Sequence, residues 1–192
     1  MYKQCIWEMP GDDHKVYLSF DDGPHPVATG FVLDLLKEHG ARATFFCIGK
    51  NVAEYGELYQ RISTEGHRVA NHSHTHPNGW KTADEDYIND IRSASVLIDS
   101  DLFRPPYGRV RFSQLGKILG ELNLRPVMWS VLSGDFDPGT SRERCARNVI
   151  RHMKPGSIIV FHDSLKAFDK LKYALPLVLA EIRKRGWVAE VL

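Results

Sequence analysis

Histidine is the residue whose number and spacing point most directly to chemistry. Nine histidines occur among 192 residues, and His72, His74 and His76 lie within five positions. Two imidazoles and one carboxylate suit a catalytic metal that keeps coordination positions open. In an extended strand His72 and His76 would lie about 13 Å apart, so His72 and His74 would be the pair sharing an ion. Over a helical turn His72 and His76, about 6 Å apart, could share it instead. A solvated polar loop is the interpretation that needs no metal.

Two adjacent carboxylates, Asp21 and Asp22, could divide a hydrolytic reaction between them. One could complete the metal site while the other accepts a proton as general base. The spacing does not say which aspartate does which. An Asx turn before Gly23 and Pro24 explains both residues without any chemistry.

His162 and Arg104 are two further candidates. His162 follows a strongly apolar run, so we expect it at the edge of a low-dielectric site where its pKa could suit a general acid. Arg104 lies in a proline-rich loop and could pair with a carboxylate. Without a catalytic role, His162 would be a core histidine and Arg104 would be a surface arginine.

Short apolar runs alternate with helical patterns along the whole chain, which predicts a parallel sheet with helical crossovers. Either an open doubly wound sheet or a closed barrel fits, and the absence of a linker or repeat predicts one domain over residues 1–192. The predicted strands are 15–20, 43–48, 67–71, 102–103, 126–131, 157–161 and 187–192. The predicted helices are 27–39, 53–65, 83–99, 113–122, 141–153 (with Ser141 as N-cap) and 175–185.

Polar clusters follow five of the predicted strands directly. They are Asp21–Asp22, His72–His76, Arg104–Gly108, Asp135–Asp137 and His162–Asp163. Because the carboxyl ends of parallel strands meet on one face of an α/β fold, these clusters are expected to converge on one site. Polar loops at strand ends would account for the aspartates, but less well for the histidines and arginine.

Composition excludes several classes of protein. The 25 basic and 24 acidic residues give a net charge of +1, so we expect no nucleic-acid partner. No apolar run approaches the roughly 18 residues of a membrane span, and the first residues lack the apolar core of a signal peptide. As written, the chain is therefore expected to be cytoplasmic and monomeric. Three widely spaced cysteines predict no disulfide framework.

Taken together, the clusters resemble the motifs of the polysaccharide deacetylase family, also called the NodB-homology or carbohydrate esterase 4 family. The resemblance runs from about residue 16 to the end, and the motifs occur in family order. They are Ser19–Pro24 (SFDDGP), His72–His76 (HSHTH), Arg104–Gly108 (RPPYG), Trp129–Phe136 (WSVLSGDF) and Val160–His162 (VFH). The resemblance implies a distorted (β/α)7-type barrel with its active site at the carboxyl ends of the strands.

The resemblance also implies a ligand set for one divalent metal ion. Asp22, His72 and His76 would hold the ion, and His74 would be spare. Zinc is the expected metal, with cobalt or nickel as alternatives.

Four residues receive catalytic roles through the resemblance. Asp21 would be the general base, held and kept ionised by Arg104. His162 would be the general acid, made more basic by Asp135. The rate profile against pH would then be bell-shaped.

The remaining implied residues bind substrate. Pro105 and Tyr107 belong to the third motif, and the Tyr107 main-chain N–H would help to hold the oxyanion. Phe136 and Val160 would line the pocket for the acetyl methyl group. The family often has Asp where this chain has Leu132, Trp at Phe136 and Leu at Val160, so the departures affect the pocket wall rather than the reacting groups.

The expected function is metal-dependent removal of N-acetyl groups from an N-acetylglucosamine-containing glycan of the peptidoglycan or chitin type, with release of acetate. The alternatives are an O-acetyl esterase acting on acetylated xylan, a hydrolase of non-sugar amides, and a non-catalytic module that binds metal or glycan. Because Asp21 and His162 are both present, the sequence argues against the last alternative.

Overall fold

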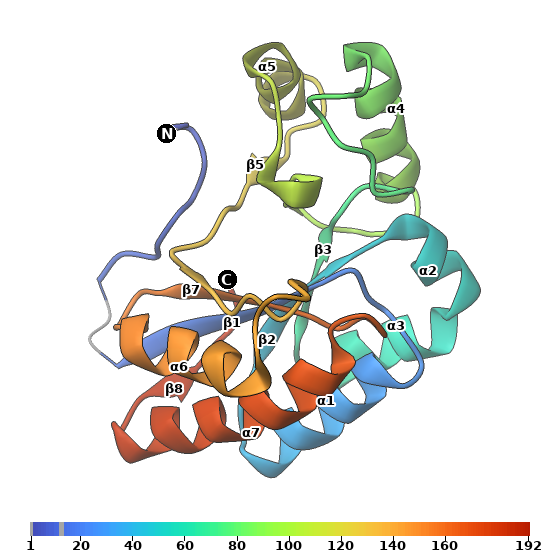
Figure 1. Cartoon of the computed structure of the whole chain (residues 1–192). Coiled ribbons are helices and arrows are strands. Elements are labelled where there is room, and N and C mark those ends of the chain that lie inside the picture. Colours follow the sequence, from blue (N-terminus) through green and yellow to red (C-terminus); the bar gives the residue numbers. More distant parts are fainter. Residues whose placement is uncertain (1, 12–13) are drawn as a thin grey trace.

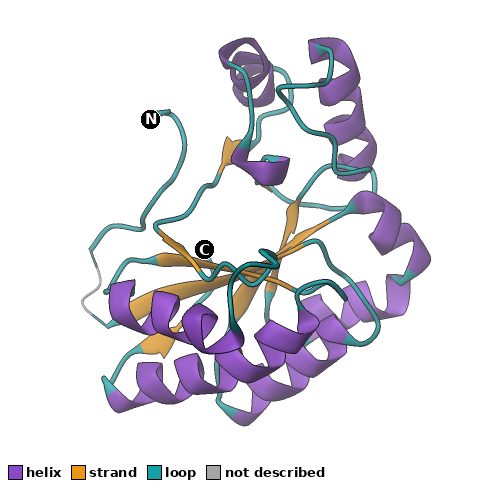
Figure 2. Ribbon diagram, viewed as in Figure 1, coloured by secondary structure: helices purple, strands orange, loops and turns teal. Residues whose placement is uncertain are grey.

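A curled sheet of parallel strands forms the centre of the molecule in this computed structural model, which describes residues 2–11 and 14–192 (Figure 2). The strands are β1 (Lys15–Asp21), β2 (Ala43–Cys47), β3 (Arg68–Asn71), β4 (Leu102–Phe103), β5 (Arg125–Pro126), β6 (Val131–Leu132), β7 (Ile158–His162) and β8 (Val188–Ala189). Their order is β5-β4-β3-β2-β1-β7-β6, with β8 pairing β1. Every pair of strands is parallel. This architecture confirms the predicted distorted barrel of about seven units as a curled half-barrel.

Within the described part of the chain, no ladder joins β5 to β6, so strand pairing does not close the barrel. The N-terminal segment crosses this gap instead. Ile6 forms a parallel bridge with Val127, and Glu8 forms an antiparallel bridge with Ser157.

Helices cover the outside of the sheet (Figure 1). They are α1 (Ala28–Glu38), α2 (Gly49–Glu54), α3 (Gly56–Thr64), α4 (Asp84–Ser95), α5 (Phe112–Gly120), α6 (Arg142–His152) and α7 (Phe168–Lys184), with a 3-10 turn at Pro106–Gly108. Helices α1, α6 and α7 lie below the sheet in this view, and α4 and α5 above it. Ser141 caps α6 as predicted, because its hydroxyl accepts the main-chain N–H of Arg144. Among the described residues, no helix combines the length and apolarity needed to cross a membrane.

The central strands are buried on both faces. All five residues of β2 are buried, as are the last six of β1. Strands of a parallel sheet that are buried on both faces are expected to carry apolar residues at most positions. Phe20 stacks on Phe45 and Phe161, with ring centroids 5.1 and 6.2 Å apart, so three neighbouring strands share one aromatic layer beneath the site. The three cysteines are free and buried.

Three predicted elements differ most from the structure. The single helix predicted over 53–65 is two helices, because the backbone leaves the helical region at Tyr55 (φ −121°, ψ 50°). The strand predicted over 126–131 is split into β5 and β6, since Met128 between them bonds to Ile6 of the N-terminal segment. Helix α7 begins at Phe168, seven residues before its predicted start, and accommodates Pro176 in its interior.

Candidate active site

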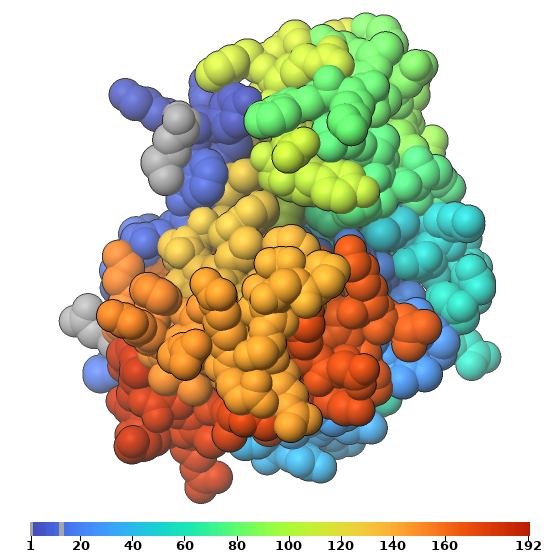
Figure 3. Space-filling model, in the orientation of Figure 1, coloured from blue at the N-terminus to red at the C-terminus, as the bar shows by residue number. Residues whose placement is uncertain are grey.

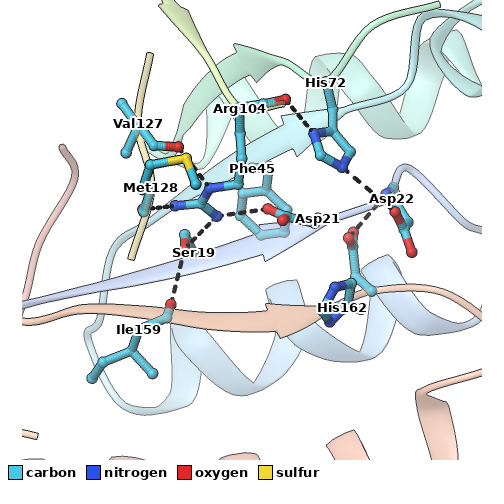
Figure 4. A network of polar contacts seen from close by, with 12 residues as sticks. Ser19, Asp21, Asp22, Phe45, His72, Arg104, Val127, Met128, Ile159 and His162 are labelled. Carbon is cyan, nitrogen blue, oxygen red and sulfur yellow. Dashed lines mark hydrogen bonds and ion pairs between the residues drawn. The ribbon is translucent and has the colours of Figure 1, made fainter. Parts of the chain in front are cut away.

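The candidate site lies where β1, β3, β4 and β7 end (Figure 4). Asp21 ends β1 and His162 ends β7, and the two residues are direct partners in the β1–β7 ladder. His72 follows β3, and Arg104 follows β4. The predicted convergence of the polar clusters is therefore observed, and the ladder fixes which side chains face each other.

Asp22, His72 and His76 form a possible metal-binding site. The Nε2 atoms of His72 and His76 lie 3.7 and 3.4 Å from Oδ1 of Asp22. One ligand atom from each of the three residues lies within 4.8 Å of the other two. The spacing in the sequence does not decide which two histidines could share an ion, and in the structure they are His72 and His76. His74 points elsewhere, with its Nδ1 2.5 Å from where a Cβ on Gly49 would lie.

The donor atoms fit a metal ion. Oδ1 of Asp22 is buried and has no hydrogen-bond partner, which is costly unless a cation lies beside it. Nδ1 of His72 lies 2.8 Å from the carbonyl oxygen of Arg104. With Nδ1 donating this hydrogen bond, Nε2 of the same ring keeps its lone pair, which is directed toward Asp22. Burial lowers the pKa of His76 to about 4. The His76 ring is therefore neutral near pH 7, the form that binds metals.

Helix α4 fixes the loop that carries the two histidines. Oδ1 of Asp90 accepts the main-chain N–H groups of His74 and Thr75 at 2.7 and 3.0 Å. The hydroxyl of Ser73 accepts the N–H of His76 at 3.1 Å. Ser73 and His76 both have positive φ, at 66° and 62°. The loop is therefore neither strand nor helix, and its tight turn brings His76 back beside His72.

Asp163 holds the turn that carries Asp22. Its buried carboxyl accepts the N–H of Gly23 at 3.0 Å and the hydroxyl of Thr29 at 2.5 Å. The side-chain amide of Asn51 donates to the carbonyl oxygen of Asp22 at 2.7 Å. Burial raises the pKa of Asp163 to about 7. Sequence reasoning gave Asp163 no role, although its place beside His162 in the last polar cluster was the available signal.

Asp21 forms a buried ion pair with Arg104. Nη1 of Arg104 donates to Oδ1 of Asp21 at 2.7 Å and to the hydroxyl of Ser19 at 2.8 Å. Its Nη2 and Nε donate to the carbonyl oxygens of Met128 and Val127 at 3.0 and 3.3 Å. Arg104 has no exposed surface. The guanidinium is thus locked by four acceptors and fixes the orientation of the Asp21 carboxyl.

The surroundings of Asp21 favour its ionised form. Burial alone would raise the pKa of this carboxyl. The charge of Arg104 is the strongest influence opposing burial, and the pKa is held below its usual value. Asp21 is therefore a carboxylate near pH 7.

His162 is paired with Asp135 on the other side of the site. Nδ1 of His162 lies 2.8 Å from Oδ1 of Asp135, and the His162 main-chain N–H donates to Oδ2 at 2.8 Å. Burial would lower the pKa of His162, but the hydrogen bond and charge of Asp135 raise it to about 9. The imidazole is therefore protonated near pH 7, and Asp135, which has no exposed surface, fixes the ring orientation.

A groove of about 990 Å³ runs over these residues. The remaining predicted substrate-binding residues all line it, namely Pro105, Tyr107, Phe136 and Val160. Leu132 and Trp129 add to the apolar wall. Figure 3 shows the yellow-green segment around 105–110 facing the orange and red-orange segments around 132–140 and 163–168 across this hollow. The site therefore combines an open groove with a floor of paired charged groups.

The comparisons with known proteins agree with this geometry. The sequence model of the family described as polysaccharide deacetylase matches residues 8–127. A peptidoglycan-N-acetylglucosamine deacetylase of Bacillus cereus is 35% identical over 176 residues, which cover 84% of this chain and 63% of that protein. A chitooligosaccharide deacetylase of Azorhizobium caulinodans is 36% identical over 155 residues, covering 77% of this chain and 73% of that protein.

A solved structure extends the likeness to the whole fold. A crystal structure of a peptidoglycan N-acetylglucosamine deacetylase superimposes with a TM-score of 0.90 at 32% identity, covering 98% of this chain and 91% of that one. The chain belongs to the polysaccharide deacetylase family, as its motifs predict.

Proposed function

We propose that this chain is a metal-dependent hydrolase that removes N-acetyl groups from an N-acetylglucosamine-containing glycan and releases acetate. The observation that carries the proposal is the placement of two oppositely charged groups beside the Asp22–His72–His76 triad. Asp21 is held ionised and His162 is held protonated, and the two are partners in one ladder. The names of the relatives support the substrate class.

Asp22, His72 and His76 would hold the ion. The chemistry supplied by a bound divalent ion, zinc or else cobalt or nickel, is polarisation of the acetyl carbonyl and acidification of water. The single carboxylate oxygen and the two Nε2 atoms leave coordination positions for water and substrate.

Asp21 would act as the general base. Its carboxylate takes a proton from the attacking water, which needs the ionised form. Arg104 keeps Asp21 ionised and also prevents its rotation, because the guanidinium is itself held by Ser19, Val127 and Met128.

His162 would act as the general acid. An amide nitrogen leaves poorly as an anion, so the departing amine needs a proton, which the His162 imidazolium donates. Asp135 holds Nδ1 of this ring, so that Nε2 is the nitrogen left to transfer the proton. The main-chain N–H of Tyr107 would stabilise the oxyanion, and Phe136 and Val160 would contact the acetyl methyl group.

Acetate release across a panel of substrates tests this proposal. The panel contains chitooligosaccharides, peptidoglycan fragments, acetylated xylan and small N-acetyl amides. We expect turnover of N-acetylglucosamine oligomers. Acetate released from acetylated xylan alone would instead assign O-acetyl esterase activity, and release from small amides alone a non-sugar amidase. Glycan binding without any release of acetate would leave a non-catalytic module.

A further inference from the structure

Three basic side chains line the groove beyond the proposed catalytic groups. Lys81, Arg109 and Lys166 are all exposed there. The acidic residues among the groove-lining residues of the described chain are Asp21 and Asp22. Both already have a function, one paired with Arg104 and the other in the possible metal site. The rim of the groove is therefore positive.

None of these three cations has an ion-pair partner in residues 2–11 and 14–192. Two basic residues at α5 behave differently, since Arg111, just before the helix, pairs with Asp84, and Lys117 pairs with Glu85. The guanidinium of Arg109 packs 4.8 Å from the ring centroid of Trp80, a contact that positions its charge without neutralising it. The cations on the rim are thus available to a ligand.

The cations come from both sides of the groove. Lys81 and Arg109 belong to the loops that follow β3 and β4, and Lys166 belongs to the short connection between β7 and α7. These loops face each other across the hollow in Figure 3. A substrate lying over the site therefore passes between positive charges on its two sides.

Hydrolysis of an acetyl group does not require these charges. A neutral sugar chain would gain little from them, whereas a cleft lined by one sign of charge concentrates ligands of the opposite sign. Resting on the function proposed above, we infer that the substrate is an anionic glycan, with carboxylates on sugars that flank the N-acetylglucosamine at the site. Lys81, Arg109 and Lys166 would bind these carboxylates and discriminate against uncharged oligomers of the same length.

Two tetrasaccharides that differ in the charge of their lactyl groups test the inference. One alternates N-acetylglucosamine with N-acetylmuramic acid, whose lactyl group carries a carboxylate, and the other is its methyl ester. The protein variants are wild type, Lys81→Gln/Lys166→Gln and the control Lys37→Gln/Arg151→Gln. The control removes the same charge from exposed residues outside the groove. Arg109 is left intact because of its contact with Trp80.

We expect the acid to be hydrolysed with the higher kcat/KM and the double variant to lose about tenfold on the acid, because each exposed ion pair contributes up to about fivefold. The ester should change less than about twofold, and the control should match wild type on both. Raising the salt from about 0.05 M to about 0.5 M should shrink the preference for the acid. Equal kcat/KM for acid and ester, or equal losses on both in the double variant, would overturn the inference.

Binding of the two tetrasaccharides to protein whose metal has been removed separates this inference from the proposed function. If wild type releases acetate from both compounds but binds and hydrolyses them equally well, the anionic preference is wrong and the deacetylase function remains. If wild type binds the acid more tightly than the ester, and the double variant does not, while no acetate is released, the anionic preference holds and the proposed reaction is wrong.

Discussion

The carboxyl of Asp163 occupies the space that a side chain on Gly23 would need. Its Oδ1 accepts the Gly23 N–H at 3.0 Å, and a Cβ on residue 23 would lie 2.1 Å from its Oδ2. The turn directly after Asp22 is therefore packed closely against a buried carboxyl. The position of the proposed metal ligand depends on this contact between two loops, 140 residues apart in the chain.

Gly23→Ala should displace the turn and weaken metal binding. The added Cβ collides with Asp163, so the backbone carrying Asp22 must shift. Loss of support around a ligand typically lowers metal affinity by about 10- to 100-fold, which titration calorimetry with zinc would measure. Gly30→Ala in α1 is the matched control, because nothing lies within 4 Å of its Cβ position. Equal zinc affinity in both variants would show that the contact does not position Asp22.

Asp21→Asn should abolish acetate release while leaving metal binding nearly unchanged. The amide cannot accept the proton of the attacking water, and loss of a general base typically costs about 10²- to 10⁴-fold in rate. Arg104 loses its charged partner but keeps three oxygen acceptors. Full activity in this variant would contradict the base assignment. Measuring zinc affinity and thermal stability alongside kcat separates lost chemistry from lost folding.

The activity should fall in alkaline solution as His162 loses its proton. With a raised pKa of about 9, the ring is protonated below that pH and becomes neutral as the pH rises through it. Asp21, with a lowered pKa, is already ionised well below neutrality, so kcat/KM should fall only on the far acid side as the carboxylate gains a proton. A profile from about pH 5 to about pH 11 would define the alkaline limb, since the acid limb lies below the ordinary carboxyl pKa.

Asp135→Asn should move the alkaline limb to lower pH. This substitution removes the charge and strong acceptor that raise the pKa of His162. Asp137→Asn is the control, since the Asp137 carboxyl bonds to Gly139 and Thr140 instead. An alkaline limb that stays in place in Asp135→Asn would mean that another group sets it.

Zinc should raise the melting temperature of wild type. A ligand at about 100 times its Kd stabilises the folded state by about 2.7 kcal/mol, which for a chain of this size corresponds to a shift of roughly 5–10 °C. His76→Ala should lose this shift because it removes one of three ligands, whereas His74→Ala should keep it. Differential scanning fluorimetry with and without zinc measures each shift against the same variant's metal-free form. A retained shift in His76→Ala would place the ion elsewhere.

The sequence allows the site to be anticipated because its residues follow strands of a parallel sheet. Asp21, Arg104 and His162 end or follow strands whose carboxyl ends must meet on one face, so their convergence follows from topology. The choice between His74 and His76 does not follow from spacing. It depends on positive φ at Ser73 and His76, which leaves the loop outside both regular geometries considered from the sequence.

The residues missed by sequence reasoning act through the backbone of these loops. Asp90 and Asp163 bind main-chain N–H groups, and the sequence around each aspartate does not indicate which loop N–H groups it contacts. The split of the strand predicted over 126–131 has a similar origin. Met128 bonds to Ile6, a partner more than a hundred residues away, which no local pattern could reveal.

Acetate release from an N-acetylglucosamine oligomer before and after metal removal tests whether the reaction depends on a bound metal. We expect chelation to abolish release by wild type and stoichiometric zinc to restore it, while Asp21→Asn stays inactive with zinc bound. Undiminished release from protein whose metal has been removed, as verified by elemental analysis, would contradict a metal-dependent reaction at this site.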